Sequence, residues 1–210
     1  MDFIFDPSLV LYLPLYKLDG ASFMSRDAYG HTCTVIGASW RPNGRYFDGS
    51  DDYISIPHNT LFNFGTGDFT IITWVNYQGG AGDTDYIVAK TKAGLAPGFV
   101  VYVAGNKVNF WGNDCAGLSS TTAPVGAGWL QATVSRISGS HKMYINGIEE
   151  ASGAATGDVD TAYALRIGIG NDLDTEWLSG IVGELIIYKG KGLNPLEIQH
   201  NYLATKWRYR

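Results

Sequence analysis

Residues 67–77 read GDFTIITWVNY, the clearest β-strand signal in the sequence. It is dense in β-branched and aromatic residues, which favour a strand over a helix. Runs of similar character recur about every 8–15 residues, separated by Gly, Asn and Asp. The other strands expected from this pattern lie at residues 10–16, 33–36, 45–47, 53–56, 85–89, 99–103, 107–111, 129–136, 142–145, 164–169 and 181–188.

Turn residues set how these strands connect. Asn146-Gly147 sits between two short apolar runs and predicts a tight hairpin, because both residues tolerate positive φ. Residues 104–106 predict a second hairpin. Pro14 lies inside the strand expected at residues 10–16, which indicates an edge strand or a bulge there. One helix is expected after Asn194-Pro195, with Glu197 in its first turn. Its buried face is expected at Leu196, Ile198, Tyr202 and Leu203.

The spacing argues for an all-β protein: a two-sheet antiparallel β-sandwich of the jelly-roll type with a short C-terminal helix. No composition shift marks a linker, so we expect a single domain over residues 1–210, with its core at about residues 9–204.

The composition excludes several classes of protein. Gly is 27 of 210 residues but Pro is only 7, and 45% of residues are hydrophobic, so the chain is not a disordered tract. The net charge is −5 without a basic block, which argues against a nucleic-acid partner. No apolar run is long enough for membrane insertion, and the N-terminus lacks the pattern of a secretory signal peptide. Cys33 and Cys115 are expected as two free thiols rather than as a disulfide.

Six motifs in a fixed order carry a family resemblance. They are LDG at 18–20 followed by RDAYGH at 26–31, RYFDGSDDYI at 45–54, GDFTIITWV at 67–75, MYING at 143–147, GELIIY at 183–188 and LNPLEI at 193–198. The chain resembles the laminin-G-like jelly rolls of the concanavalin A-like lectin/glucanase superfamily. The resemblance implies two packed antiparallel sheets, binding of glycans or protein surfaces, and often a bound calcium ion. The tail 198–210 is similar to endings of such domains in phage structural proteins.

The loop Asp48-Gly49-Ser50-Asp51-Asp52 is the candidate calcium site. It offers three carboxylates in five residues, and calcium takes six to eight oxygen ligands. Glu184, or Asp27 and Asp19, are candidates to complete the shell. The family commonly has an Ile-Asp-Glu run where this chain has Val182-Gly183-Glu184, so Glu184 would have to replace the missing Asp. The alternative is an ordinary turn, in which Asp caps its own backbone.

The run Asn171-Asp172-Leu173-Asp174-Thr175-Glu176-Trp177 raises the question of catalysis. On a strand, Asp172, Asp174 and Glu176 would share one face, which is similar to the alternating carboxylates of laminarinase-like glucanases. However, the first position there is normally Glu, and the laminin-G-like pattern places a loop here. We therefore expect no catalytic residues, and a solvated loop or a loop lining a ligand site.

A glycan site needs exposed aromatic rings beside polar side chains. Two groups fit this description: Trp111 with Asn113 and Asp114, and Trp177 with Asp172 and Asp174. Tyr77 is a candidate wall of the site. The alternative for each aromatic residue is burial in the sandwich core, which is expected for Trp74.

These features favour a non-catalytic, lectin-like domain that binds carbohydrate or a cell-surface glycoconjugate, with calcium as a structural cofactor. One alternative is a virion or surface structural protein that uses the jelly roll for assembly with other virion subunits or as a homo-oligomer. A second alternative is a β-glucan hydrolase. Either of the first two functions predicts an extracellular or virion-surface location.

Overall fold

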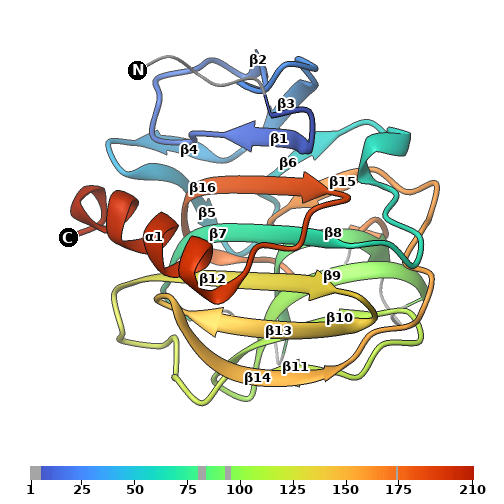
Figure 1. Cartoon of the computed structure of the whole chain (residues 1–210). Helices are drawn as coiled ribbons and strands as arrows, with labels where there is room; N and C mark the ends of the chain where they lie inside the picture. The colour runs from blue at the N-terminus through green and yellow to red at the C-terminus, as the bar shows by residue number, and fades with distance from the viewer. Residues whose placement is uncertain (1–5, 80–83, 93–95, 174) are drawn as a thin grey trace.

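A computed structural model describes residues 6–79, 84–92, 96–173 and 175–210 (Figure 1). Two antiparallel sheets pack face to face, as expected for a jelly roll. Sheet A has the order β14-β13-β12-β7-β16-β5-β4, with β1 also paired to β16. Sheet B has the order β11-β10-β9-β8-β15-β6-β3-β2.

The strand bounds follow the two sheets. Sheet A contains β1 (Leu9–Leu13), β4 (Ser39–Arg41), β5 (Gly44–Asp48), β7 (Phe69–Tyr77), β12 (Trp129–Ile137), β13 (Ser140–Ile145), β14 (Ile148–Ala154) and β16 (Ser179–Lys189). Sheet B contains β2 (Ser22–Met24), β3 (Thr32–Ile36), β6 (Tyr53–Ile56), β8 (Thr84–Lys92), β9 (Ala96–Ala104), β10 (Lys107–Gly112), β11 (Leu118–Ser119) and β15 (Leu165–Ile167).

The core lies between the sheets and is built on aromatic rings. Phe69 of β7 lies 4.7 Å from Phe64 and 6.1 Å from Phe110 of β10, between ring centroids. Phe99 of β9 stacks on Phe64 at 5.2 Å. Offset and tilted ring pairs at these distances add to the hydrophobic stabilisation of burial. The strand predicted from residues 69–77 is β7, at the centre of sheet A.

The turns match their sequence signals. Asn146 and Gly147 adopt φ of 53° and 78°, and they join β13 to β14 as a two-residue turn. Gly105 and Asn106 do the same between β9 and β10. β1 ends at Leu13, directly before Pro14, with a bulge between Leu9 and Leu11. Both cysteines are free thiols, as expected.

The helix α1 (Pro195–Thr205) crosses the outer face of sheet A (Figure 1) and continues into η2 (Lys206–Arg208). Asn194 caps it by accepting from the amides of Leu196 and Glu197, and Glu197 completes a capping box. The expected buried face is only partly correct, because Ile198 is buried but Leu196 and Leu203 are exposed. A short 3₁₀ turn, η1 (Thr60–Phe62), precedes β7. No helix in the described part of the chain is long and apolar enough to cross a membrane.

Two buried cations tie the segment 58–67 to the segment 157–161. Arg136 of β12 is fully buried and donates to the carbonyls of Gly65 (2.6 Å), Gly67 (2.6 Å) and Gly157 (3.0 Å). Lys90 of β8 is also fully buried. Its ammonium donates to the Asn63 amide oxygen at 2.7 Å and to the Thr161 carbonyl. Burial lowers the pKa of Lys90 to about 8.

Replacing Arg136 by Met should destabilise the fold by at least about 3 kcal/mol, because three buried carbonyls lose their donors. Urea denaturation measures this loss. Lys142→Met is the matched control on the adjacent strand β13, because Lys142 forms an exposed ion pair with Glu149 and its loss should change the free energy of unfolding little. Equal losses for the two variants would contradict the role assigned to Arg136.

Candidate functional site

The outer face of sheet B carries two rows of side chains that run across the strands. Paired residues in the first row are Trp111, Val100, Ala89, Arg166 and Ser55, from β10 to β6. The second row pairs Asn109 with Tyr102 and Tyr102 with Tyr86. With a strand spacing of about 4.8 Å, four steps across this face span roughly 19 Å. This face is long enough for an extended ligand.

The loop between β15 and β16 folds back over the middle of this face. Asn171 fixes it by donating its side-chain amide to the carbonyls of Thr91 and Ala164, both at 2.9 Å. The Tyr86 amide donates to the Glu176 carbonyl at 3.0 Å. A Cβ at Gly170 would lie only 3.1 Å from the Tyr86 ring, so glycine allows this close approach. The loop buries Tyr86 and divides the face into two aromatic patches.

The first patch, here the Trp111 patch, consists of the half-buried rings of Trp111 and Tyr102, which pack on Tyr86 and Val100. Asn109 and Ser119 lie beside it on β10 and β11, joined by a 2.6 Å hydrogen bond. The Asn109 amide is held by the carbonyls of Ala104 and Lys107. The patch therefore presents two rings in a polar frame of fixed geometry.

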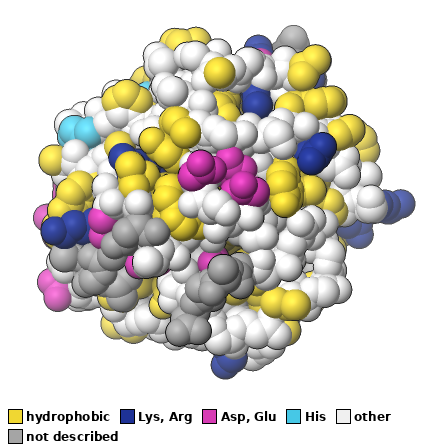
Figure 2. Space-filling view, turned by 180° about the vertical axis from the view of Figure 1, so that it is seen from behind, with side chains coloured by type: hydrophobic (Ala, Val, Ile, Leu, Met, Phe, Trp, Pro, Cys, Tyr) yellow, Lys and Arg dark blue, Asp and Glu magenta, His cyan; other side chains and the backbone are white. Residues whose placement is uncertain are grey.

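The second patch, here the Trp177 patch, lies at the other side of the loop. The rings of Trp177 and Tyr53 are 6.2 Å apart, and the Arg166 guanidinium lies 5.3 Å from the Tyr53 ring centroid. Arg166 also donates to the Gly170 carbonyl at 2.9 Å. Burial lowers the pKa of Arg166, and the nearby Tyr53 and Asp172 partly oppose this shift. Figure 2, seen from the side opposite to α1, shows acidic side chains grouped between apolar patches.

The acidic loop joins β5 to β6, next to the Trp177 patch. Asp48, Asp51 and Asp52 bring one carboxylate oxygen each within 4.8 Å of one another. Asp52 is buried, and its carboxylate accepts from the Asp48 amide at 3.0 Å. Burial raises the pKa of Asp52, as do the charges of Asp48 and Asp51, so the three carboxylates repel one another.

Comparison with known proteins gives the family. The model of the concanavalin A-like lectin/glucanase superfamily matches residues 48–199. The chain belongs to this superfamily. No curated protein matches the sequence significantly.

Solved structures with this fold include several binding domains and a sialidase. The binding domain of Paraclostridial Mosquitocidal Protein 1 matches with a TM-score of 0.76 at 13% identity, over 94% of this chain and 52% of that chain. The botulinum neurotoxin serotype D ligand-binding domain in complex with N-acetylneuraminic acid gives 0.74 at 16%, over 94% and 51%. Trypanosoma rangeli sialidase gives 0.73 at 17%, over 97% and 34%. This chain thus spans about half or a third of these chains, and identities this low establish the fold alone.

The concanavalin A-like fold brings together only some of the residues singled out from the sequence. Trp111, Trp177 and Asp172 lie on or beside the outer face of sheet B. Asn113 and Asp114 follow Trp111, but the Asn113 amide bonds to the Asp114 carboxylate (3.1 Å) and the Asp158 carbonyl (3.2 Å) instead of facing the patch. Asp174 lies outside the described residues.

Tyr77 does not form a wall of the site. It is only 7% exposed and belongs to the core between the sheets. Its hydroxyl donates to the buried carboxylate of Asp85. The prediction from sequence was wrong because the side-chain alternation of β7 sends Tyr77 inward.

Glu184 and Asp27 do not join the acidic loop. Glu184 lies under the C-terminal tail, where its carboxylate pairs with the Arg208 guanidinium at 2.9 Å. Asp27 accepts from the amides of Tyr12 (3.0 Å), Tyr29 (2.8 Å) and Gly30 (3.1 Å), so it caps its own turn. Asp19 pairs with Arg26. The three carboxylates of residues 48–52 are the only acidic group of this kind among the described residues.

The alternating carboxylates do not form a strand. Residues 168–173 and 175–178 are irregular, and β15 ends at Ile167. The side chains of Asp172 and Glu176 therefore lack the regular two-residue alternation that the glucanase motif requires. This arrangement agrees with a loop that lines a ligand site.

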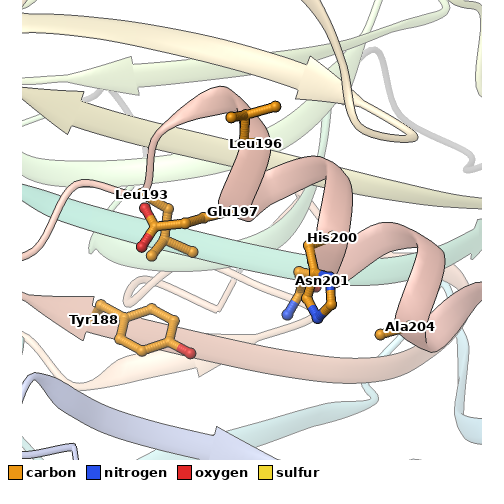
Figure 3. A pocket seen from close by; sticks show the side chains of 7 residues that line it. All are labelled: Tyr188, Leu193, Leu196, Glu197, His200, Asn201 and Ala204. Atoms are coloured by element: carbon orange, nitrogen blue, oxygen red, sulfur yellow. The ribbon is translucent and has the colours of Figure 1, made fainter.

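Sequence reasoning missed a groove of about 520 Å³ between α1 and β16 (Figure 3). The Tyr188 ring forms its floor, and Glu197 and His200 project over it from α1. Leu193, Leu196 and Ala204 make the remaining lining largely apolar. The signal in the sequence was the spacing of apolar residues in α1: Leu196 and Leu203 do not lie on the same face of the helix as the buried Ile198.

The buried ion pair of Glu184 makes stability depend on pH. Burial raises the pKa of Glu184 from 4.5 to about 7, although the charge of Arg208 opposes the shift. Because the folded pKa lies above the unfolded one, the stabilisation from this carboxyl is present below about pH 4.5 and is lost as the pH rises to about 7.

Glu184→Gln stays uncharged at every pH, so its free energy of unfolding should rise relative to wild type between pH 4.5 and 7 and then level off. Urea denaturation across this range measures the difference. Glu149→Gln, at an exposed ion pair, should follow the wild-type curve in parallel. A wild-type curve parallel to that of Glu184→Gln would overturn the assignment.

Proposed function

We propose that this chain is a non-catalytic carbohydrate-binding domain whose saccharide ligand lies on the outer face of sheet B. The observation that carries the proposal is the pair of half-buried aromatic patches on this face, with the segment fixed by Asn171 between them. Sugars stack their C–H faces on aromatic rings and hydrogen-bond through their edges. Trp111 and Trp177 supply the rings, while Asp172 and Arg166 supply polar contacts at the centre.

The comparisons support the same class of ligand. Some of the structures with this fold are binding domains, and one of them is in complex with N-acetylneuraminic acid. A glycan or a cell-surface glycoconjugate is therefore the proposed partner, and the location that fits it is extracellular or on a virion surface. The low number of exposed rings indicates weak binding at each patch, so both patches acting on one ligand would raise affinity.

Trp111→Ala and Trp177→Ala should each weaken binding to an oligosaccharide identified on a glycan array at least tenfold, because each removes a stacking platform. Isothermal titration calorimetry measures the affinity. Trp207→Ala is the matched control, since Trp207 is an exposed tryptophan on η2, away from sheet B. Full affinity in both sheet B variants would contradict the proposal.

A calcium ion at Asp48, Asp51 and Asp52 is part of the same proposal. Three converging carboxylates suit this hard cation, and its charge would relieve the repulsion that adds to burial in raising the pKa of Asp52. Since Tyr53 follows Asp52 directly, the ion would also stiffen one side of the Trp177 patch. Backbone carbonyls and water would complete the shell, because Glu184 and Asp27 have other partners.

Calcium should raise the melting temperature of the wild-type protein relative to a sample in chelator, because binding to the folded state alone stabilises it. Asp51→Asn should remove this increase, and Asp114→Asn, at another exposed Asp, should leave it intact. Differential scanning fluorimetry makes the comparison. Equal melting temperatures with calcium and with chelator would remove the metal from the proposal.

The second candidate function is assembly as a virion or surface structural protein. The observation in its favour is the exposed apolar stripe on the C-terminal helices, where Leu196 is 77%, Leu203 50% and Trp207 62% exposed. Leu196 of this stripe also lines the groove of Figure 3. Exposed apolar clusters of this kind mark contact surfaces between proteins. The two functions use opposite faces of the sandwich, so variants of one face leave the other intact.

A further inference from the structure

The outer face of sheet A carries a small cavity of about 270 Å³ under the C-terminal tail. Its lining residues are Trp74, Trp129, Tyr202, Tyr209, Lys206 and Arg210. Four aromatic rings and two cationic side chains thus meet in one place. No Asp or Glu lines the cavity in the part of the chain that the structure describes.

The aromatic walls are rigid. The Tyr209 ring packs against Trp74 at 4.5 Å and against Trp129 at 4.8 Å, between centroids. Trp74 also stacks on Tyr202 at 5.7 Å, and its indole N–H donates to the Thr205 hydroxyl at 3.0 Å. A Cβ at Gly183 would lie 2.3 Å from the Tyr209 ring, so the ring rests directly on the sheet. The walls are therefore held in place before any ligand arrives.

The two cationic side chains of the cavity are not paired with an acidic side chain among the described residues. Arg208 forms an ion pair with Glu184, but neither Lys206 nor Arg210 forms an ion pair with a described residue. The Lys206 ammonium instead lies 5.4 Å from the Tyr202 ring centroid. The chain as a whole has a net charge of −5, so this concentration of positive charge at one place is local.

From this geometry we infer that the cavity is a binding site for a single anionic sugar ring, one that carries a carboxylate or a sulfate. The ring stacks on Trp129, and its acidic group meets Lys206 and Arg210. The volume limits the ligand to about one ring, because sites for larger ligands measure about 300–1,000 Å³. The site lies on the opposite sheet from the Trp111 and Trp177 patches and does not depend on them.

The test titrates the full chain with three probes followed by NMR: methyl glucuronide, a glucose sulfate and neutral methyl glucoside. Both anionic probes should shift the Trp129 indole signal and bind at least fivefold tighter than the neutral glucoside. Raising NaCl from 50 to 500 mM should weaken the anionic probes alone, since salt screens the contact with the cations. Binding of only one anionic probe would narrow the ligand to uronates or to sulfated sugars.

Lys206→Gln removes one cation from a partly exposed position and should lower the affinity for methyl glucuronide at least fivefold. Lys107→Gln, at an exposed lysine on β10, is the matched control and should change nothing. Trp111→Ala should also leave the affinity unchanged, which separates this site from the proposed function. Equal binding of charged and neutral probes, or full affinity in Lys206→Gln, would overturn the inference, and so would loss of binding in Trp111→Ala.

Discussion

Two buried cations hold one end of the sandwich together, and the candidate site depends on them. Arg136 and Lys90 come from different sheets, yet both bind carbonyl or amide oxygens of the segments 58–67 and 157–161. A buried charge without such partners is very costly, so the two segments are fixed where the cations require them. The second segment leads directly into β15, which carries Arg166 and the loop that follows it.

The loop between β15 and β16 covers the middle of the outer face of sheet B and leaves an aromatic patch on each side. Fixed through Asn171, it covers Tyr86 and leaves Trp111 and Trp177 half-exposed on either side. The opposite face is covered by α1 and the tail, which bury Trp74 and pair Glu184 with Arg208. An aromatic ring at an outward-facing strand position is thus buried at Trp74 of sheet A but half-exposed at Trp111 of sheet B.

Much of the fold could be predicted because its signals are local. Asn146-Gly147 fixes a hairpin through its positive φ, and Asn194 with Glu197 fixes the start of α1 through a capping box. The density of β-branched and aromatic residues in 69–77 identifies a strand without reference to any other part of the chain. The order of motifs then identified the superfamily, which the match over residues 48–199 confirms.

The site was predictable only in part, because its residues are brought together by long-range contacts. Trp111 and Trp177 carry a sequence signal, since polar residues flank them, but Tyr102 and Arg166 do not. Tyr77 was misplaced because burial depends on which face of β7 turns inward. Glu184 was misplaced because its partner, Arg208, follows 24 residues later on a different element. The buried roles of Lys90 and Arg136 have no local signature, since each depends on carbonyls from two distant segments.

Whether a saccharide binds on the outer face of sheet B is tested by following the indole N–H signals of the six tryptophans by NMR during titration with neutral oligosaccharides. Binding on the outer face of sheet B predicts that the signals of Trp111 and Trp177 shift together with one affinity, while those of Trp74 and Trp207 stay in place. A neutral oligosaccharide that binds without moving Trp111 or Trp177 would contradict the account.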